Sequence, residues 1–321
     1  MLVLWAPGPM AAQSDDGRTG TLVVLNKSAA TATFIDVASG TTVATLPTGR
    51  GPHELAITTD GRWAVSTDYS GGNSLTVFDV ANVRVERTID LSQYVRPHGA
   101  FFLPGDSILA VTSEGTGNVV LVHPLRGDIV GVIGTGDGRS HMVAVTGDGR
   151  TLYTGNIQAG TVSRLDVASR RMTGTFDVPA QPEAITVSKD GAEVWVGSNA
   201  TGVVSILDTE TGAVDSPLSG FEWPYRILIV EEHGLVVIPD LGRHVVRFVD
   251  HESRRDISTL ELPGEGPQGV ALTADRGTLF LSLSNAGQVA VIDLSSRRIV
   301  RRIEAGPTPD GIGWSPLVVR R

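Results

Sequence analysis

Short runs of alternating hydrophobic and polar residues recur along the whole chain. One stretch shows the pattern clearly, with apolar-rich runs at 184–188, 193–196, 203–207 and 213–217 that are separated by polar loops. A period of two is typical of half-buried β-strands, and runs of this length are shorter than the periodic segments of helices. The pattern therefore predicts groups of four short strands.

One phrase opens each group: a proline, a variable residue, a small or apolar residue, an apolar run and then a tight turn such as Asp60-Gly61. Its seven copies begin at steps of 42 to 45 residues, at Pro52, Pro97, Ser140, Pro182, Pro224, Pro267 and Pro309. That step is the length of a four-stranded propeller blade. The sequence therefore predicts an all-β fold, a seven-bladed β-propeller with four-stranded blades.

The two ends of the chain are expected to complete one blade together. The copy at Pro309 has room for one strand, whereas three further strands, at 21–25, 32–35 and 42–46, precede the copy at Pro52. We expect the N-terminal strands to pair with the C-terminal strand, because this pairing closes the ring and removes two open sheet edges. The predicted propeller is a single domain that spans 20–321.

The repeat resembles a known family. The stretches 152–156 (LYTGN) and 194–199 (VWVGSN), and the strand endings at 34–36, 77–79 and 291–293, are similar to the YVTN-type propeller repeat. That family includes YncE-like and lactonase-like propellers, so the resemblance implies the seven-bladed fold and is weak for activity. The fifth copy departs at its turn, and Glu54, Met142, Ala184 and Arg226 replace the glycine of the family's Pro-x-Gly in four copies.

Composition and charge narrow the classes of function. The net charge is −9 and basic residues are scattered in ones and twos, so the chain lacks the concentrated positive surface that nucleic acids require. Cysteine is absent, which excludes disulfides and thiolate metal sites and leaves His, Asp, Glu and backbone oxygen as metal ligands. No apolar run is long enough to predict a transmembrane segment. We expect a monomer.

The first residues, 1–19, do not follow the repeat. Residues 2–6 are apolar and 10–12 resemble the small-residue end of a secretory signal, although a basic start is missing and the apolar stretch is short. We interpret 1–19 as the remnant of a signal peptide, which predicts a periplasmic or secreted protein. A disordered tail on a cytoplasmic protein is the alternative interpretation.

Three histidines occupy one special position of the repeat. A propeller places the start of every first strand at one mouth of the central channel, together with the loops between second and third strands. The residue after the proline is, around the ring, His53, His98, His141, Glu183, Tyr225, Gln268 and Asp310. This repeat position accounts for only seven of the 321 residues, yet it holds three of the seven histidines of the chain. The three histidines lie on consecutive blades.

Such a cluster indicates a metal site. Neutral imidazole is a common ligand of divalent Zn, Cu, Fe and Ni, and three histidines leave coordination positions open for water or substrate. We expect His53, His98 and His141 to bind the metal, with Glu183 as a fourth ligand or a general base. Two alternatives are that each histidine bonds separately to a neighbouring loop, or that the cluster binds an oxyanion or a cofactor.

Other polar residues share the same rim. Asp68 and Tyr69 would lie above the histidine blades as candidate catalytic residues that support the metal ligands. Tyr225 and Arg226, with Arg243, could bind a carboxylate or phosphate on the opposite side of the mouth. The candidate substrate-binding residues are Tyr225, Arg226, Arg243, Gln268, Asp310 and Glu114.

The favoured function is a metal-dependent enzyme, an oxidoreductase, lyase or hydrolase, that activates water, a substrate oxygen or O₂ on a small molecule at the channel mouth. A second hypothesis is a non-catalytic propeller that recognises a protein partner or small ligand at the same rim. The family resemblance suggests two more, a lactonase-like hydrolase and a haem-type cofactor held by one histidine.

Overall fold

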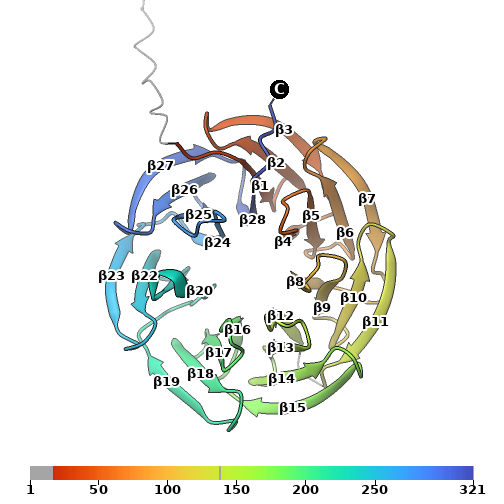
Figure 1. The fold of residues 1–321 in the computed structure, drawn as a ribbon, viewed down its shortest axis with the longest axis vertical. Coiled ribbons are helices and arrows are strands. Elements are labelled where there is room, and N and C mark those ends of the chain that lie inside the picture. The colour runs from red at the N-terminus through yellow and green to blue at the C-terminus, as the bar shows by residue number, and fades with distance from the viewer. Residues whose placement is uncertain (1–16, 137–138, 321) are drawn as a thin grey trace, which may run out of the picture.

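Seven four-stranded antiparallel sheets surround a central channel in the computed structural model, which describes residues 17–136 and 139–320 (Figure 1). The seven-bladed all-β propeller predicted from the repeat is therefore confirmed. The expectation for the N-terminal tail concerns mainly residues 1–16, which lie outside the described residues. No helix among the described residues has both the length and the apolar character that crossing a membrane would need.

Blades are numbered here in the order of the repeat. Blades 1 to 3 comprise β4 (Pro52–Ile57), β5 (Trp63–Asp68), β6 (Ser74–Asp79), β7 (Arg84–Asp90), then β8 (Pro97–Phe102), β9 (Leu109–Ser113), β10 (Asn118–His123), β11 (Asp128–Gly134), then β12 (Ser140–Val145), β13 (Thr151–Asn156), β14 (Thr161–Asp166) and β15 (Arg171–Asp177). Blades 4 to 6 comprise β16 (Pro182–Val187), β17 (Glu193–Ser198), β18 (Val203–Asp208), β19 (Val214–Leu218), then β20 (Leu228–Val230), β21 (Leu235–Asp240), β22 (Val245–Asp250), β23 (Asp256–Glu261), then β24 (Pro267–Leu272), β25 (Thr278–Leu283), β26 (Gln288–Asp293) and β27 (Arg298–Glu304). A short 3₁₀ helix, η1 (Glu231–His233), forms the first turn of blade 5.

Blade 7 joins the two ends of the chain, as the sequence predicts. Its sheet order is β28-β1-β2-β3, in which β28 (Pro309–Ser315) pairs with β1 (Thr21–Asn26), followed by β2 (Thr31–Asp36) and β3 (Thr41–Pro47). The register sets Leu22 opposite Trp314 and Val24 opposite Ile312. The ring is therefore closed by hydrogen bonds between strands from opposite ends of the sequence.

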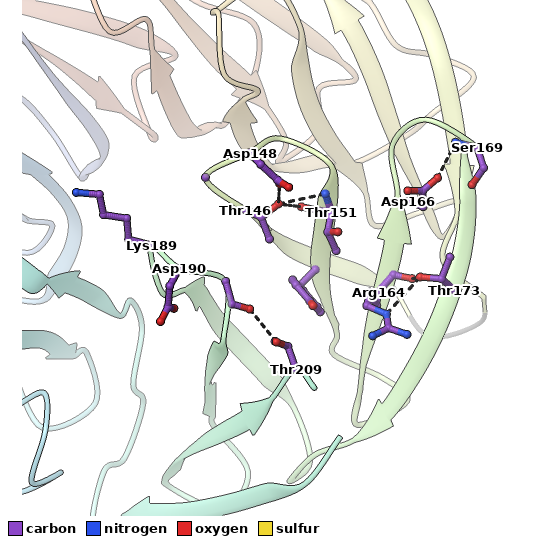
Figure 2. Close-up of a pocket in the computed structure, with 13 residues that line it drawn as sticks. Thr146, Asp148, Thr151, Arg164, Asp166, Ser169, Thr173, Lys189, Asp190 and Thr209 are labelled. Carbon is purple, nitrogen blue, oxygen red and sulfur yellow. Dashed lines mark hydrogen bonds between the residues drawn. The ribbon is translucent and has the colours of Figure 1, made fainter. Parts of the chain in front are cut away.

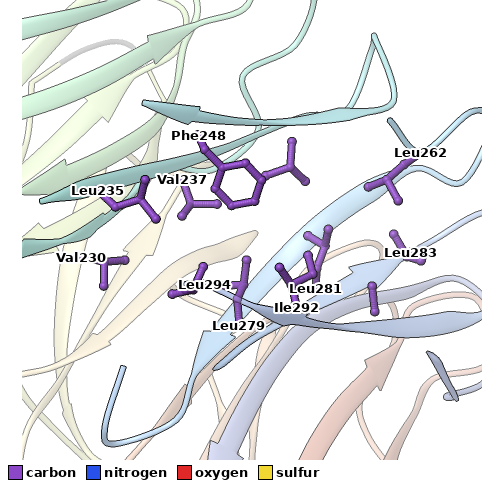
Figure 3. Packing of buried hydrophobic residues seen from close by; sticks show 12 residues of the cluster. Val230, Leu235, Val237, Phe248, Leu262, Leu279, Leu281, Leu283, Ile292 and Leu294 are labelled. Atoms are coloured by element: carbon purple, nitrogen blue, oxygen red, sulfur yellow. The ribbon is translucent and has the colours of Figure 1, made fainter. Parts of the chain in front are cut away.

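The hydrophobic core lies between the blades. Side chains alternate between the two faces of each strand, so Val23 and Leu25 pack toward blade 1 while Leu22 and Val24 pack toward blade 6. Figure 3 shows one such interface, in which Phe248 of blade 5 packs beside leucines of blade 6. Among the described residues, seven buried clusters fill the seven interfaces between neighbouring blades. This packing holds the inner strands in fixed positions around the channel.

Candidate functional site

A β-bulge at the start of several first strands sets the direction of the channel-mouth side chains. In blade 1, Pro52 pairs with Asp68 but Leu55 pairs with Ser66, so the register shifts across His53 and Glu54. Blades 2 and 3 show the same shift across their second and third positions. In a regular strand two successive side chains point to opposite faces, whereas a bulge can turn both toward one side. The bulge thus explains how His53 and Glu54 contribute to one site.

Threonine side chains on the second strands stabilise these bulges. The backbone N–H of Glu54 donates to the hydroxyl of Thr67 at 3.0 Å, and the N–H of Gly99 donates to Thr112 at 2.8 Å. A bulged residue leaves the backbone ladder, so its N–H needs another acceptor. The local sequence supplies that acceptor at the same place in two blades.

The structure brings the three predicted histidines together, with all three side chains buried. The ring centroids of His53 and His98 are 4.3 Å apart with the planes at 89°, and those of His98 and His141 are 3.7 Å apart with the planes at 31°. The Tyr69 ring closes the group, at 4.7 Å from the His98 ring. The three consecutive blades therefore form one continuous imidazole cluster.

His98, at the centre of the cluster, has no satisfied ring nitrogen. Its side chain is 0% exposed, and neither Nδ1 nor Nε2 has a hydrogen-bond partner among the described residues. Burial, together with the nearby charges of His141 and His53, lowers the pKa of His98 well below its usual range. His98 is therefore a neutral imidazole with free lone-pair capacity, which is the form that binds metals.

The ligand atoms that converge are those of His53, Glu54 and His98. One potential ligand atom from each of these residues lies within 4.8 Å of the other two. Two histidines and a carboxylate form a donor set that suits divalent transition metals and leaves positions open. This set differs from the predicted three-histidine set, because Glu54 joins His53 and His98 while the ring of His141 stacks on His98.

His141 is held between two carboxylates. Its Nε2 lies 3.2 Å from Glu183 and its Nδ1 lies 3.6 Å from Glu114, while Asn199 donates to the other oxygen of Glu183 at 3.0 Å. Burial opposes the charged imidazole, but Glu183 and Glu114 outweigh burial and raise the pKa of His141 to about 9. His141 is therefore charged at neutral pH, next to the neutral His98.

Glu114 joins His141 to the rim of the channel. It accepts a 2.5 Å hydrogen bond from the hydroxyl of Tyr69, and Arg96 contacts both Tyr69 and Glu114. Burial disfavours the charged carboxylate, but the nearby His141 imidazole and the hydrogen bond from Tyr69 lower the pKa of Glu114 to about 2. Burial and the Glu114 bond raise the pKa of Tyr69 to about 12, so its hydroxyl stays protonated.

Asp310 supports His53 from blade 7. Its carboxylate contacts Nδ1 of His53, accepts from Lys27 at 3.2 Å and accepts from the hydroxyl of Tyr225 at 3.2 Å. Burial opposes its charge, but His53 and Lys27 lower the pKa of Asp310 well below its usual range. A carboxylate on one ring nitrogen commonly orients metal-bound histidines, and here it leaves Nε2 of His53 available. Asp310 was predicted to bind substrate, and in the structure it bonds within the protein.

Blade 5 reaches across the channel. Arg226 forms an ion pair with Glu54, and it also donates to the backbone oxygen of Tyr225 at 2.6 Å. The guanidinium lies over the Tyr225 ring, 4.1 Å from its centroid. Tyr225 and Arg226 are predicted to bind an anion on the far side of the mouth; in the structure Tyr225 contacts Asp310 of blade 7 and Arg226 contacts Glu54 of blade 1.

Three predicted residues lie apart from the cluster. Asp68 is fully buried and accepts from Ser74 at 2.6 Å and Thr76 at 2.9 Å, which ties together two strands of its own blade. Burial outweighs these bonds and raises its pKa. The Arg243 side chain is 55% exposed and lies 3.9 Å from Asp240, and Gln268 has a buried Oε1 without a partner among the described residues. No contact of these three with the histidines is seen in the described part of the chain.

Sequence reasoning missed three residues that the structure places at the site. Glu54 was noted only as a departure from the repeat, and Lys27 and Arg96 were not considered. One signal was present, since Glu54 and Arg226 are charged residues of opposite sign at the same position of two copies. Their pairing depends on the distance across the channel, which the repeat alone does not give.

Two surface grooves lie at the opposite ends of the strands, and a third runs along the outer strand β7 and the turn before β11. Figure 2 shows a groove of about 610 Å³ between blades 3 and 4, lined by turn residues that include Asp148, Asp166 and Asp190. These carboxylates accept hydrogen bonds within their own turns, as Asp148 does from Thr146 at 2.7 Å. Turn closure explains their positions.

Comparisons with known proteins extend the description of the fold. No protein-family model matches the chain, and no curated protein matches its sequence. Among solved structures, a chain of Kuenenia stuttgartiensis hydrazine synthase is similar with a TM-score of 0.76 and 20% identity, over 85% of this chain and 92% of that chain. A functionally unknown protein from Desulfotomaculum acetoxidans is similar with a TM-score of 0.77 and 15% identity, over 92% and 99%. At these identities the likeness shows the seven-bladed propeller fold, and the YVTN-type family stays a resemblance.

Proposed function

We propose that this propeller is a metal-dependent enzyme whose divalent metal binds in the channel mouth to His53, Glu54 and His98. The observation that carries the proposal is the buried His98, whose two ring nitrogens have no hydrogen-bond partner among the described residues. An unsatisfied buried polar group costs about 1–3 kcal/mol. A metal bound to His98 would offset this cost, and the neighbouring ligand atoms of His53 and Glu54 support that reading.

The supporting residues fit such a site. Asp310 contacts Nδ1 of His53, which fixes the ring and leaves Nε2 for the metal. A divalent Zn, Cu, Fe or Ni ion in a set of two histidines and a carboxylate supplies an open position for water, a substrate oxygen or O₂.

A charged acid lies beside the ligands. His141 stacks on His98, and its Nε2 is 3.2 Å from Glu183. In this proposal the charged His141 stabilises negative charge that develops on the reacting group, while Glu183 and Glu114 face its two ring nitrogens and keep the imidazole charged and oriented. The near-complete burial of His98, His141 and Glu183 favours a small substrate.

A non-catalytic binding propeller is the second candidate. The ion pair between Arg226 and Glu54 crosses the channel, and the described grooves lie at the far ends of the strands. Both observations favour it. The charged side chains at the mouth already pair with each other, and the two grooves that could bind a partner lie away from the histidines. The structural neighbour from hydrazine synthase is an enzyme, and at 20% identity it adds only that this architecture occurs in one.

Elemental analysis of untagged protein tests the metal site. We expect near-stoichiometric metal in the wild type and in a His123→Ala control, because His123 ends β10 of the same blade as His98 at its far end. We expect strong loss in His98→Ala and Glu54→Gln. Absence of metal in the wild type, even after incubation with Zn, Cu, Fe or Ni, would contradict the proposal.

Turnover separates the two candidates. The loaded wild type and His98→Ala are compared on a panel of small esters, lactones and substrates oxidised with O₂. Turnover that requires His98 supports the enzyme, whereas stoichiometric metal without turnover favours the binding propeller.

A further inference from the structure

Only two of the seven third positions of the repeat are charged, and these two pair with each other. The third residues are Glu54, Gly99, Met142, Ala184, Arg226, Gly269 and Gly311. Glu54 lies in β4 and Arg226 shortly precedes β20, and these two strands lie on opposite sides of the ring in Figure 1. Their ion pair therefore joins blade 1 to blade 5 across the channel.

The irregular start of blade 5 makes this contact feasible. Its first strand begins at Leu228, and before that only Pro224 forms an isolated bridge to the second strand. Tyr225 and Arg226 thus lie outside the regular strand, although the backbone N–H of Tyr225 still donates to the carbonyl of Pro239 in β21 at 2.9 Å. Packing over the Tyr225 ring and the bond to the Tyr225 carbonyl hold the guanidinium in the channel mouth.

The carboxylate of Glu54 can interact with two different partners. It is the anionic member of the converging ligand set, and it is the carboxylate paired with Arg226. The other carboxylates near Arg226 are engaged elsewhere. Asp310 contacts His53 and Lys27, and Glu183 contacts His141 and Asn199.

Charge balance then constrains what binds. The charges of Glu54 and Arg226 cancel each other, so a divalent cation that binds to His53 and His98 adds two positive charges beside this ion pair. The side chains of Glu54 and Arg226 are only 12% and 10% exposed, so water compensates this charge poorly. If Glu54 turns its carboxylate toward a metal, the buried guanidinium of Arg226 loses an acceptor, and some of its N–H donors are left without a partner.

We infer that the site binds its metal together with a small oxyanion of the carboxylate type, which the Arg226 guanidinium holds next to the metal. The inference rests on the proposed function, and it names the substrate class of that site. A guanidinium can donate two parallel hydrogen bonds to a carboxylate, a geometry that lysine cannot offer. In this structure Nη2 of Arg226 contacts Glu54, and Nη1 donates to the carbonyl of Tyr225. In the absence of metal, Glu54 takes the place of the anion.

Formate and Co²⁺ test the coupling. The Kd of Co²⁺ is measured from its visible absorption, with and without formate. In the wild type we expect formate to tighten Co²⁺ binding at least about fivefold, since coupled sites strengthen each other reciprocally. In Arg226→Gln we expect Co²⁺ to bind at least as tightly as in the wild type without formate, because a competing positive charge is gone, and formate to have no further effect.

Arg247 provides a matched control on the same blade. It pairs with Asp256 at 2.7 Å, its guanidinium lies 3.8 Å from the centroid of the Phe221 ring, and its side chain is 12% exposed. Arg247→Gln therefore removes a similar ion pair away from the channel mouth, and we expect it to keep the formate effect. A formate effect that is absent in the wild type, or that persists in Arg226→Gln, overturns the inference.

A metal-free arm separates this inference from the proposed function. Glu54→Gln leaves Arg226 without its carboxylate, so we expect formate to raise the Tm of this variant in the presence of a chelator. The double variant Glu54→Gln/Arg226→Gln should show no such rise. If the wild type binds no metal, the proposed function fails, and this arm alone shows whether Arg226 binds an oxyanion. If formate changes the Tm of the two variants equally, oxyanion binding by Arg226 is overturned as well.

Discussion

At the scale of single residues, His98 is placed for binding rather than for stability. A buried ring with two unsatisfied nitrogens costs free energy in the metal-free protein. We predict that His98→Leu, which introduces an apolar side chain of similar size, is at least as stable as the wild type in the presence of a chelator. Its free energy of unfolding should be higher by up to about 3 kcal/mol. We also predict that added Zn²⁺ raises the Tm of the wild type only.

Thermal and denaturant unfolding of both proteins, with and without chelator, check this prediction. A variant that is clearly less stable than the wild type in chelator would show that the ring nitrogens are satisfied without a metal. Such a result would remove the main argument for the site.

The charged state of His141 depends on Glu183. With a pKa of about 9 instead of 6.5, His141 contributes stability that is fully present below pH 6.5 and is lost as the pH rises through 9. We predict that Glu183→Gln lowers this pKa and weakens the loss of stability between pH 6.5 and 9, by about 3 kcal/mol at most. NMR titration of the imidazole in metal-free protein measures the pKa, and an unchanged value in Glu183→Gln would contradict the prediction.

The residues of the site were predictable to different degrees. The histidines stood out because they share one repeat position, and the structure brings their rings together. Glu54 escaped because a regular strand would turn it away from His53, and only the bulge allows both to converge. Asp68 looked like a rim residue by position, yet its carboxylate bonds to hydroxyls of its own blade.

At the scale of elements, the period-two alternation and the turn residues located most strands within a residue or two. The four strands expected in blade 4, for example, correspond to β16 to β19. Blade 5 differs, because its first strand is reduced to Leu228–Val230. The proline and the apolar run are present there, so the sequence pattern alone predicts a full strand, whereas Tyr225 and Arg226 make contacts across the channel.

Strand β28 is the element on which ring closure depends. We predict that deletion of 309–321 abolishes cooperative unfolding, because it uncovers β1 along its whole length and removes the packing of Ile312 against Leu22 and Val24. The loss is comparable with the total stability of a domain, about 5–15 kcal/mol. Denaturant unfolding and size-exclusion chromatography provide the measurement.

A circular permutant is the control for this deletion. A chain that begins at Pro309 and continues through a short Gly-Ser linker into Gly17 keeps every strand, and Ser315 already lies opposite Thr21. We expect the permutant to unfold cooperatively. Cooperative unfolding of the deleted chain would show that blade 7 does not need β28.

At the scale of the whole molecule, the repeat determines the ring and the differences between its copies determine the site. Seven near-equal steps were enough to predict seven blades. The partners at the channel mouth are far apart in sequence, as Glu54 and Arg226 are by 172 residues, and they meet only because the ring closes. Contacts of this kind depend on the diameter of the channel and on local bulges, which no single copy of the repeat encodes.

The central claim is that the channel mouth binds a divalent metal. Anomalous diffraction from crystals grown with Zn²⁺ or Co²⁺ tests this claim most directly. The account predicts one strong peak within about 2.0–2.2 Å of ring nitrogens of His53 and His98 and of a Glu54 oxygen. Ordered water bonded to the His98 nitrogens, with no anomalous peak at saturating metal, would contradict the account and leave the cluster as an internal polar network.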